Sequence, residues 1–140
     1  MKVLFVCRGN VGRSQIAEAL LKKVDSGRFE VSSAGTKLSG PEQPIGELMP
    51  AIKEVLDVMN EVGIDVSHNI RRQVTEEMAN DADKIILVVD DNDPIPDYLT
   101  DNSKVIRWDV LDPKGKDLEF TRNVRNQITD LIKLFVADNK

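Results

Sequence analysis

The stretch VLFVCRGNVGRS, which runs from Val3 to Ser14, decides how this chain folds. Its first four residues are apolar and predict a buried strand, whereas the apolar residues from Gln15 to Val24 recur at helical spacing. The loop between them therefore leads from a strand into the start of a helix. Backbone N–H groups at a helix start lack partners and carry the positive end of the helix dipole, so this loop is suited to holding an oxyanion.

A cysteine opens the loop and an arginine closes it. The helix start, Arg8 and Arg13 all favour the thiolate of Cys7, which is the form that attacks. Arg13 can bind two oxygens of a phosphoryl group with its planar fork, and Ser14 can donate a hydrogen bond to the thiolate. We therefore predict that Cys7 is a nucleophile and Arg13 its clamp. The competing interpretation is that Cys7 is a small apolar residue that ends a strand.

The backbone of the same loop is expected to surround the anion. Gly9 and Gly12 allow a close approach, and Asn10 can adopt the left-handed conformation that an anion-binding nest requires. The predicted phosphate-binding residues are Arg8, Gly9, Asn10, Val11, Gly12, Arg13 and Ser14.

The segment VLFVCRGNVGRSQIAEAL resembles the opening of the low-molecular-weight protein tyrosine phosphatases and of the arsenate reductases that share their fold. Similar segments follow in the same order, namely VSSAGT at 31–36, GIDVSH at 63–68 and WDVLDP at 108–113. The resemblance covers nearly the whole chain. It implies a cysteine-dependent phosphomonoester hydrolase with a phosphocysteine intermediate, acting on phosphorylated proteins or small phosphomonoesters and binding phosphate or other oxyanions.

Asp112 is the predicted general acid. It follows the fourth predicted strand, at the sheet edge where Cys7 lies, and it matches the aspartate of the family's Asp-Pro motif. It would protonate the leaving oxygen and then activate water; the competing interpretation is that Asp112-Pro113 is only a turn, with Asp109 as the second choice of acid. The resemblance also implies that His68 supports Asn10 through hydrogen bonds, in a network that Ser33 joins.

Departures from the family pattern leave other functions open. Gly12 stands where many members have a second cysteine, Lys114 stands where tyrosine commonly follows Asp-Pro, and the loop 36–50 has no aromatic residue. Gln15, in place of the usual proline, resembles the arsenate reductases. Because the chain has one cysteine, only a reductase that uses an external small thiol is compatible. A weakly catalytic phosphate-binding regulatory module is the other alternative.

No metal or cofactor is expected. Asp90, Asp91 and Asp93 could hold Mg²⁺, but a solvated turn is the more common role of such a cluster. Trp108 could line the cleft, but an aromatic residue beside a strand more often packs in the core.

Composition limits the possible partners. The net charge of −5 argues against nucleic-acid binding, and no apolar run is long enough to cross a membrane. A single cysteine excludes an internal disulfide, and the first apolar run lacks the features of a signal peptide. We expect a cytoplasmic protein, monomeric, with one domain over residues 1–140.

Alternating strand and helix patterns indicate an α/β fold. The predicted strands cover 3–6, 29–33, 84–89 and 104–107, and the predicted helices cover 15–24, 50–62, 75–78 and 118–136. This order predicts a three-layer sandwich, doubly wound and flavodoxin-like, in which helices cover both faces of a four-stranded parallel sheet. The site is expected outside the carboxyl ends of the strands.

Overall fold

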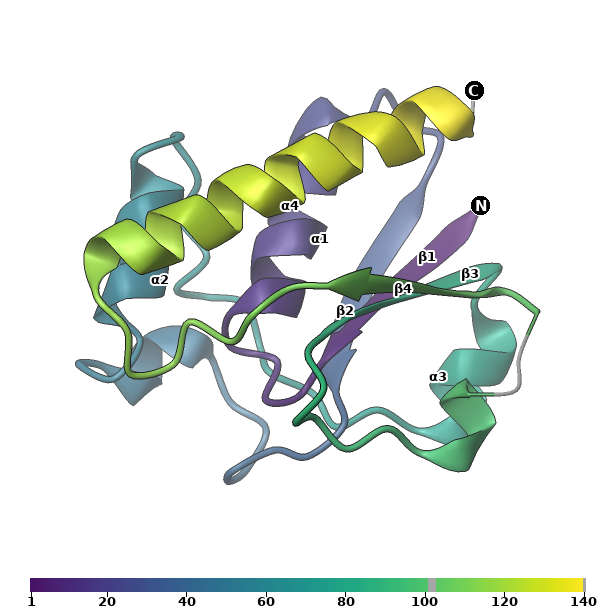
Figure 1. Cartoon of the computed structure of the whole chain (residues 1–140), viewed down its shortest axis with the longest axis horizontal. Coiled ribbons are helices and arrows are strands. Elements are labelled where there is room, and N and C mark those ends of the chain that lie inside the picture. The colour runs from purple at the N-terminus through teal and green to yellow at the C-terminus, as the bar shows by residue number, and fades with distance from the viewer. Residues whose placement is uncertain (101–102, 140) are drawn as a thin grey trace.

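Four parallel strands form one sheet in the order β2-β1-β3-β4 (Figure 1). The computed structural model describes residues 1–100 and 103–139. The strands are β1 (Lys2–Cys7), β2 (Glu30–Gly35), β3 (Lys84–Val89) and β4 (Val105–Asp109). The predicted single-domain α/β fold with a four-stranded parallel sheet is confirmed. β1 lies in the middle, so its carboxyl end is flanked by the loops that leave both neighbouring strands.

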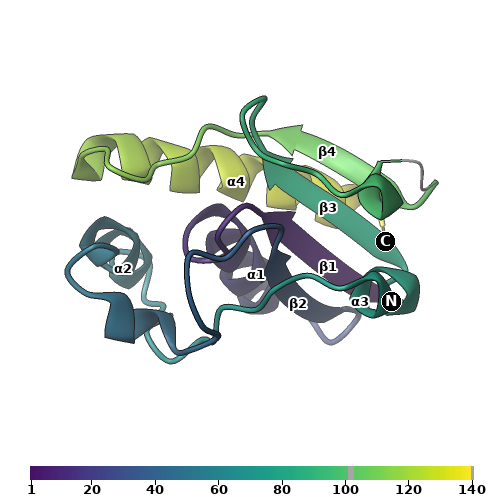
Figure 2. The ribbon, with the colours of Figure 1, turned by 90° about the horizontal axis from the view of Figure 1, so that it is seen from below.

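Helices cover both faces of the sheet, as predicted. They are α1 (Arg13–Val24), α2 (Lys53–Asn60), α3 (Glu76–Asp81) and α4 (Leu118–Asp138), with two short 3₁₀ helices at Ile45–Leu48 and Asp97–Leu99. α1 and α4 lie on one face, where α2 packs against the start of α4, and α3 lies on the other (Figure 2). None of the helices within residues 1–100 and 103–139 is long and apolar enough to span a membrane.

The apolar runs of the central strands supply two cores because neighbouring side chains point to opposite faces. Phe5 and Ile86 pack beneath α1 and α4, whereas Val6 and Leu87 pack toward α3. Trp108 lies in the first core, with its ring 5.8 Å from that of Phe5 between centroids. Its packing role, which the sequence favoured, is confirmed.

Several element boundaries differ from the predictions. β4 continues to Asp109 because it stays paired with β3 through Val89, and α2 begins at Lys53, after turn residues at 50–52. The predicted loop 36–50 contains the short 3₁₀ helix Ile45–Leu48. These shifts leave the site at the predicted edge, where the loops after β1, β3 and β4 meet.

Candidate active site

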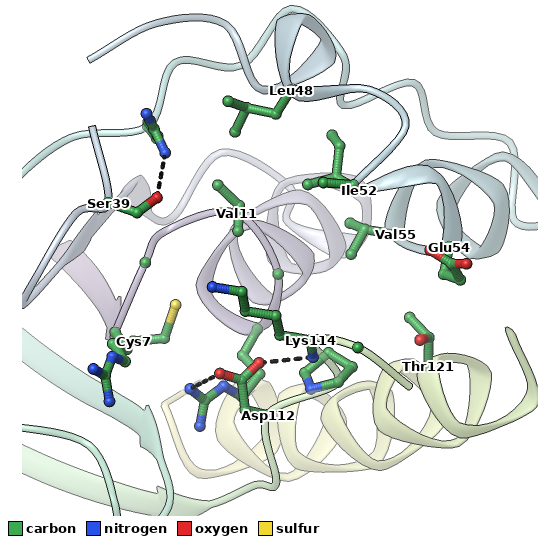
Figure 3. Close-up of a pocket in the computed structure, with 18 of the residues that line it drawn as sticks. Cys7, Val11, Ser39, Leu48, Ile52, Glu54, Val55, Asp112, Lys114 and Thr121 are labelled. Carbon is green, nitrogen blue, oxygen red and sulfur yellow. Dashed lines mark hydrogen bonds and ion pairs between the residues drawn. The ribbon is translucent and has the colours of Figure 1, made fainter. Parts of the chain in front are cut away.

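Cys7 is the last residue of β1, and its side chain faces a cavity of about 500 Å³ (Figure 3). The loop 8–12 curves around this cavity before α1 begins at Arg13. Cys7 is only 2% exposed, and its Sγ lies 2.9 Å from Oγ of Ser14. The Cys7 side chain and the start of a helix therefore share one cavity, an arrangement that suits oxyanion binding.

Asn10 holds the loop in shape. It has a φ of 56°, in the left-handed region that the sequence predicted, and its side chain is fully buried. The backbone N–H of Arg72 donates to its Oδ1 at 2.8 Å, and Gln15 donates to the same oxygen at 3.4 Å. Its Nδ2 donates to the hydroxyls of Ser14 at 2.7 Å and Ser33 at 3.0 Å. Each polar atom of the amide thus has a partner, and these hydrogen bonds hold the loop in its conformation.

This network directs the Ser14 hydroxyl proton toward Cys7. The N–H of Arg72 can only donate, so Oδ1 of Asn10 must face it and Nδ2 must face Ser14. Oγ of Ser14 accepts from Nδ2 and keeps its own proton for the sulfur. The contact between Ser14 and the sulfur of Cys7 that the sequence predicted is therefore present.

His68 does not join the network, and the expectation that it supports Asn10 is corrected. Its side chain is 90% exposed, and its Nε2 lies 3.8 Å from a carboxylate oxygen of Asp65. Gln15 and the backbone of Arg72 occupy the acceptor oxygen of Asn10 instead. Ser33 joins the network as expected, because its hydroxyl accepts a hydrogen bond from Nδ2 of Asn10 at 3.0 Å. The sequence pattern could not show which of several neighbouring polar groups reaches a single amide.

Gly35, at the end of β2, allows the loop to come close. A Cβ at this position would lie 2.7 Å from the backbone oxygen of Arg8 and 3.0 Å from the backbone nitrogen of Asn10. Both distances are shorter than normal contacts of a methyl group. The close approach that the sequence assigned to Gly9 and Gly12 is therefore most restrictive at Gly35, where side chains of any size would displace the loop.

Arg13 is 2% exposed and lines the cavity. Its Nη1 donates to Asp93 at 2.8 Å and to the carbonyl of Val110 at 2.9 Å. Burial opposes its charge, but the Asp93 hydrogen bond and the charges of Cys7 and Asp112 outweigh burial and raise the pKa of Arg13. Nε and Nη2 make no hydrogen bond within the described residues, although Nη2 lies 3.6 Å from a carboxylate oxygen of Asp112, so this edge of the guanidinium has donors left for two oxygens of a phosphoryl group.

The acidic cluster after β3 is not a solvated turn throughout. Asp91 is exposed and pairs with Arg107, but Asp93 is only 3% exposed and binds Arg13. The carboxylate of Asp90 lies 3.9 Å from Arg13 and accepts the backbone N–H of Asp112 at 3.3 Å. The sequence interpretation is therefore wrong for Asp90 and Asp93. Their position at the carboxyl end of a strand next to β1 was the signal that could have revealed them.

Asp112 lies at the edge of the cavity (Figure 3). One carboxylate oxygen lies 3.6 Å from Nη2 of Arg13, and the other accepts the backbone N–H of Lys114 at 2.9 Å. The side chain is 37% exposed, so it can exchange protons with solvent. Asp109, the second choice of acid, instead pairs with Arg107 and does not line the cavity.

The surroundings of Asp90, which lies next to Arg13 and Asp112, lower the pKa of its carboxyl group. Burial raises the pKa of Asp90, but backbone hydrogen bonds from Asn92 and Asp112 and the charge of Arg13 lower it by more than burial raises it. The pKa is therefore below its usual value. Asp90 is therefore ionised at neutral pH and can hold the chain at Asp112 in place.

Both aliphatic and charged side chains line the cavity. Val11, Leu48, Ile52 and Val55 form aliphatic surface around the space in front of Cys7 (Figure 3). The cavity is lined by five cationic side chains and two carboxylates; these are Arg8, Arg13, Lys37, Arg71 and Lys114 with Glu54 and Asp112. A chain of net charge −5 thus has a locally positive cavity, which attracts anions.

The predicted phosphate-binding residues divide into two sets. Arg8, Gly9, Val11, Gly12 and Arg13 line the cavity, whereas Asn10 and Ser14 are buried and act from behind the loop. Within residues 1–100 and 103–139, no group of three or more His, Cys, Asp or Glu side chains could hold a metal ion.

Comparison with known proteins agrees with this geometry. The family model described as low molecular weight phosphotyrosine protein phosphatase matches residues 2–138. A glutaredoxin arsenate reductase of Synechocystis sp. is 30% identical to the chain, with 97% of this chain and 96% of the relative covered.

Two solved structures share the fold over almost their full lengths. A low molecular weight protein tyrosine phosphatase from T. tengcongensis has a TM-score of 0.81 and 28% identity, covering 99% of both chains. An arsenate reductase in the phosphate-binding state has a TM-score of 0.78 and 29% identity, covering 98% of this chain and 97% of its own. The chain therefore belongs to the low molecular weight phosphotyrosine protein phosphatase family, whose fold also serves arsenate reductases.

Proposed function

We propose that the chain is a cysteine-dependent phosphomonoester hydrolase of the protein tyrosine phosphatase type. The observation that carries this proposal is the position of Asp112, which shares one cavity with Cys7 and lies 3.6 Å from Arg13. An acid at this edge is useful when an alkoxide or phenoxide leaves, because the departing oxygen needs a proton. The aliphatic walls support an organic leaving group.

In the first step, the Cys7 thiolate attacks phosphorus as the bond to the leaving oxygen breaks. The Asp112 carboxyl gives its proton to that oxygen, and the alcohol or phenol departs. The free edge of Arg13 and the N–H groups of the loop bind the equatorial oxygens, whose negative charge they stabilise. The product of this step is a phosphocysteine.

In the second step, water attacks the phosphocysteine. The Asp112 carboxylate takes a proton from water while the new phosphorus–oxygen bond forms and the sulfur–phosphorus bond breaks. Phosphate leaves, and the Cys7 thiolate is restored with Ser14 beside it. Asp112 ends the cycle protonated, ready for the next ester.

Arsenate reduction with an external thiol is the second candidate function. The names of the curated relatives favour it, and one of these relatives is a glutaredoxin arsenate reductase. Cys7 would displace water from arsenate, and an external thiol would then attack the Cys7 sulfur, releasing arsenite and leaving a mixed disulfide. A second thiol would reduce that disulfide. The single cysteine of the chain requires both electrons to come from outside.

Two parallel assays distinguish hydrolysis from arsenate reduction. One measures the turnover of para-nitrophenyl phosphate, and the other measures arsenite formation from arsenate plus glutathione. We expect phosphate release that falls by about four orders of magnitude in Cys7→Ala, since this substitution removes the nucleophile. Arsenite formed only with added thiol, with negligible ester hydrolysis, would replace the proposal with the reductase. Phosphate binding without either reaction would favour the regulatory module.

A further inference from the structure

Arg71 is a buried cation that the proposed reaction does not use. It is 4% exposed and lines the same cavity as Cys7. Its Nε donates to the carbonyl of Pro41 at 2.8 Å, and its Nη1 donates to Oγ of Ser39 at 3.2 Å. It forms no ion pair within residues 1–100 and 103–139, and Nη2 donates no hydrogen bond there. A buried charge without a counter-charge is unfavourable unless an anion joins it.

Gly40 packs closely against this guanidinium and so helps to fix its position. A Cβ at Gly40 would lie 2.7 Å from Nη2 of Arg71, so a residue with a side chain would push this nitrogen out of its present position. Ser39, which accepts from Arg71, lies on the side of the cavity away from Asp112 (Figure 3). The unpaired guanidinium is therefore separate from the place where Arg13 and Asp112 flank Cys7.

Other charged residues that line the cavity also favour an anion near Arg71. Lys37 lies on the segment that leads to Ser39 and also lines the cavity, whereas Glu54 belongs to the wall on α2. The reacting phosphate has Arg13 and the loop as partners, so Arg71 remains available to another group of the same ligand.

We propose that Arg71 binds a carboxylate carried by the leaving group, so that the preferred substrate is a phosphomonoester with a second anionic group. This inference rests on the proposed phosphomonoester hydrolysis, whose leaving group would extend from Cys7 along the aliphatic walls. Two N–H groups of Arg71 already anchor the segment 39–41, which orients the guanidinium and leaves Nη2 free to donate. The carboxylate would gain a charge-assisted hydrogen bond from a preoriented donor.

Matched esters test the proposal. 4-(Carboxymethyl)phenyl phosphate and its carboxamide have similar leaving oxygens, because the methylene separates the charge from the ring, and 4-(2-carboxyethyl)phenyl phosphate with its amide extends the reach. For at least one pair we expect kcat/KM to favour the acid by about 10- to 100-fold. Arg71→Met should reduce this ratio to about 1, and Arg71→Lys should retain part of it.

Arg72→Met is the matched control, because it removes the same charge from the neighbouring exposed side chain, which does not line the cavity. We expect it to keep the acid-to-amide ratio. Gly40→Ala offers a second test that keeps the arginine in the sequence, and it should lower the ratio by displacing Nη2 from its present position. If Arg71 only holds the loop together, Arg71→Met will slow both esters equally and the ratio will survive, which overturns the proposal.

Binding measurements distinguish a failure of this inference from a failure of the proposed function. The dissociation constants of the acid and amide esters for the Cys7→Ala protein are measured by calorimetry, with and without Arg71→Met. Tighter binding of the acid that depends on Arg71, without turnover by the native chain, would refute hydrolysis and keep the subsite. Turnover with equal rates and equal binding for acid and amide would refute the subsite and keep hydrolysis.

Discussion

The charged residues of the site differ in their exposure to water, since Arg13 and Asp93 have almost fully buried side chains whereas Asp112 does not. Arg13 keeps its charge although it is 2% exposed, because Asp93 binds one nitrogen and Asp112 lies near another. Asp93 is 3% exposed, whereas Asp112 is 37% exposed and can exchange its proton with solvent. The two carboxylates therefore suit different tasks, one orienting the arginine and the other transferring protons.

The proposed acid role of Asp112 predicts a dependence on the leaving group. Asp112→Asn should lower kcat/KM for phenyl phosphate by about 100- to 1000-fold, because the phenoxide then leaves without a proton. The loss for 2,4-dinitrophenyl phosphate, whose anion is stable, should be less than about tenfold. Steady-state rates for both esters check this. Asp109→Asn, a nearby aspartate outside the cavity, is the control, and an equal loss for the two esters would contradict the assignment of Asp112 as acid.

At the level of elements, the carboxyl end of β2 supports the loop 8–12. β1 and β2 run in register until Cys7 pairs with Gly35. Beyond this pair, the backbone N–H of Thr36 donates to the carbonyl of Cys7 at 2.8 Å, and that of Lys37 donates to the carbonyl of Arg8 at 2.9 Å. The second strand thus continues its pairing into the loop, which lets a sheet hold a binding loop rigidly.

Gly35→Ala should therefore displace the loop. Its Cβ would lie 2.7 Å from the carbonyl oxygen of Arg8, so we expect kcat/KM to fall about 100-fold, with a loss of about 1–3 kcal/mol in the free energy of unfolding. Kinetics and urea unfolding measure the two effects. Gly46→Ala is the control, since its Cβ would lie 2.8 Å from the backbone oxygen of Ser67. It should lose similar stability with a much smaller loss of activity; equal activity losses would refute the special role of Gly35.

For the whole molecule, one glutamate links the helix that carries a cavity wall to the long C-terminal helix. Glu61 follows α2 and accepts hydrogen bonds from Arg122 at 2.6 Å and 2.9 Å and from Arg125 at 2.7 Å, both on α4. Val55 of α2 lines the cavity. The wall in front of Cys7 is thus fastened to α4, which packs on α1.

The ion pairs between Glu61 and the two arginines of α4 predict part of the loss of stability at acidic pH. The hydrogen bonds from Arg122 and Arg125 lower the pKa of Glu61 from 4.5 to about 2. Because the pKa of Glu61 is lower in the folded state, its ionised carboxylate contributes to the free energy of unfolding above pH 4.5. This contribution is lost as the pH falls toward 2. Urea unfolding at pH 6 and pH 3 should show a smaller pH-dependent loss for Glu61→Gln than for the native chain. Glu77→Gln, at an exposed glutamate on α3, should behave like the native chain; an unchanged loss in Glu61→Gln would contradict the link.

Local patterns were sufficient for the fold. The apolar runs of β1 and β3 and the helical spacing in α1 and α4 depend on neighbours in sequence, and Thr75 caps α3 by accepting the backbone N–H of Met78. Boundaries at β4 and α2 were less accurate, since pairing with β3 and packing against α4 decide where these elements end.

The sequence by itself determined that a parallel α/β sheet presents Cys7 and Arg13 on one strand-to-helix loop, because their spacing is local and the loop geometry follows from it. Only the tertiary structure decided the partners of those residues. Asp93 reaches Arg13 across 80 positions, the backbone of Arg72 replaces His68 at Asn10, and Arg71 comes to line the cavity. Such contacts depend on how separate loops meet at one sheet edge, which no local pattern specifies.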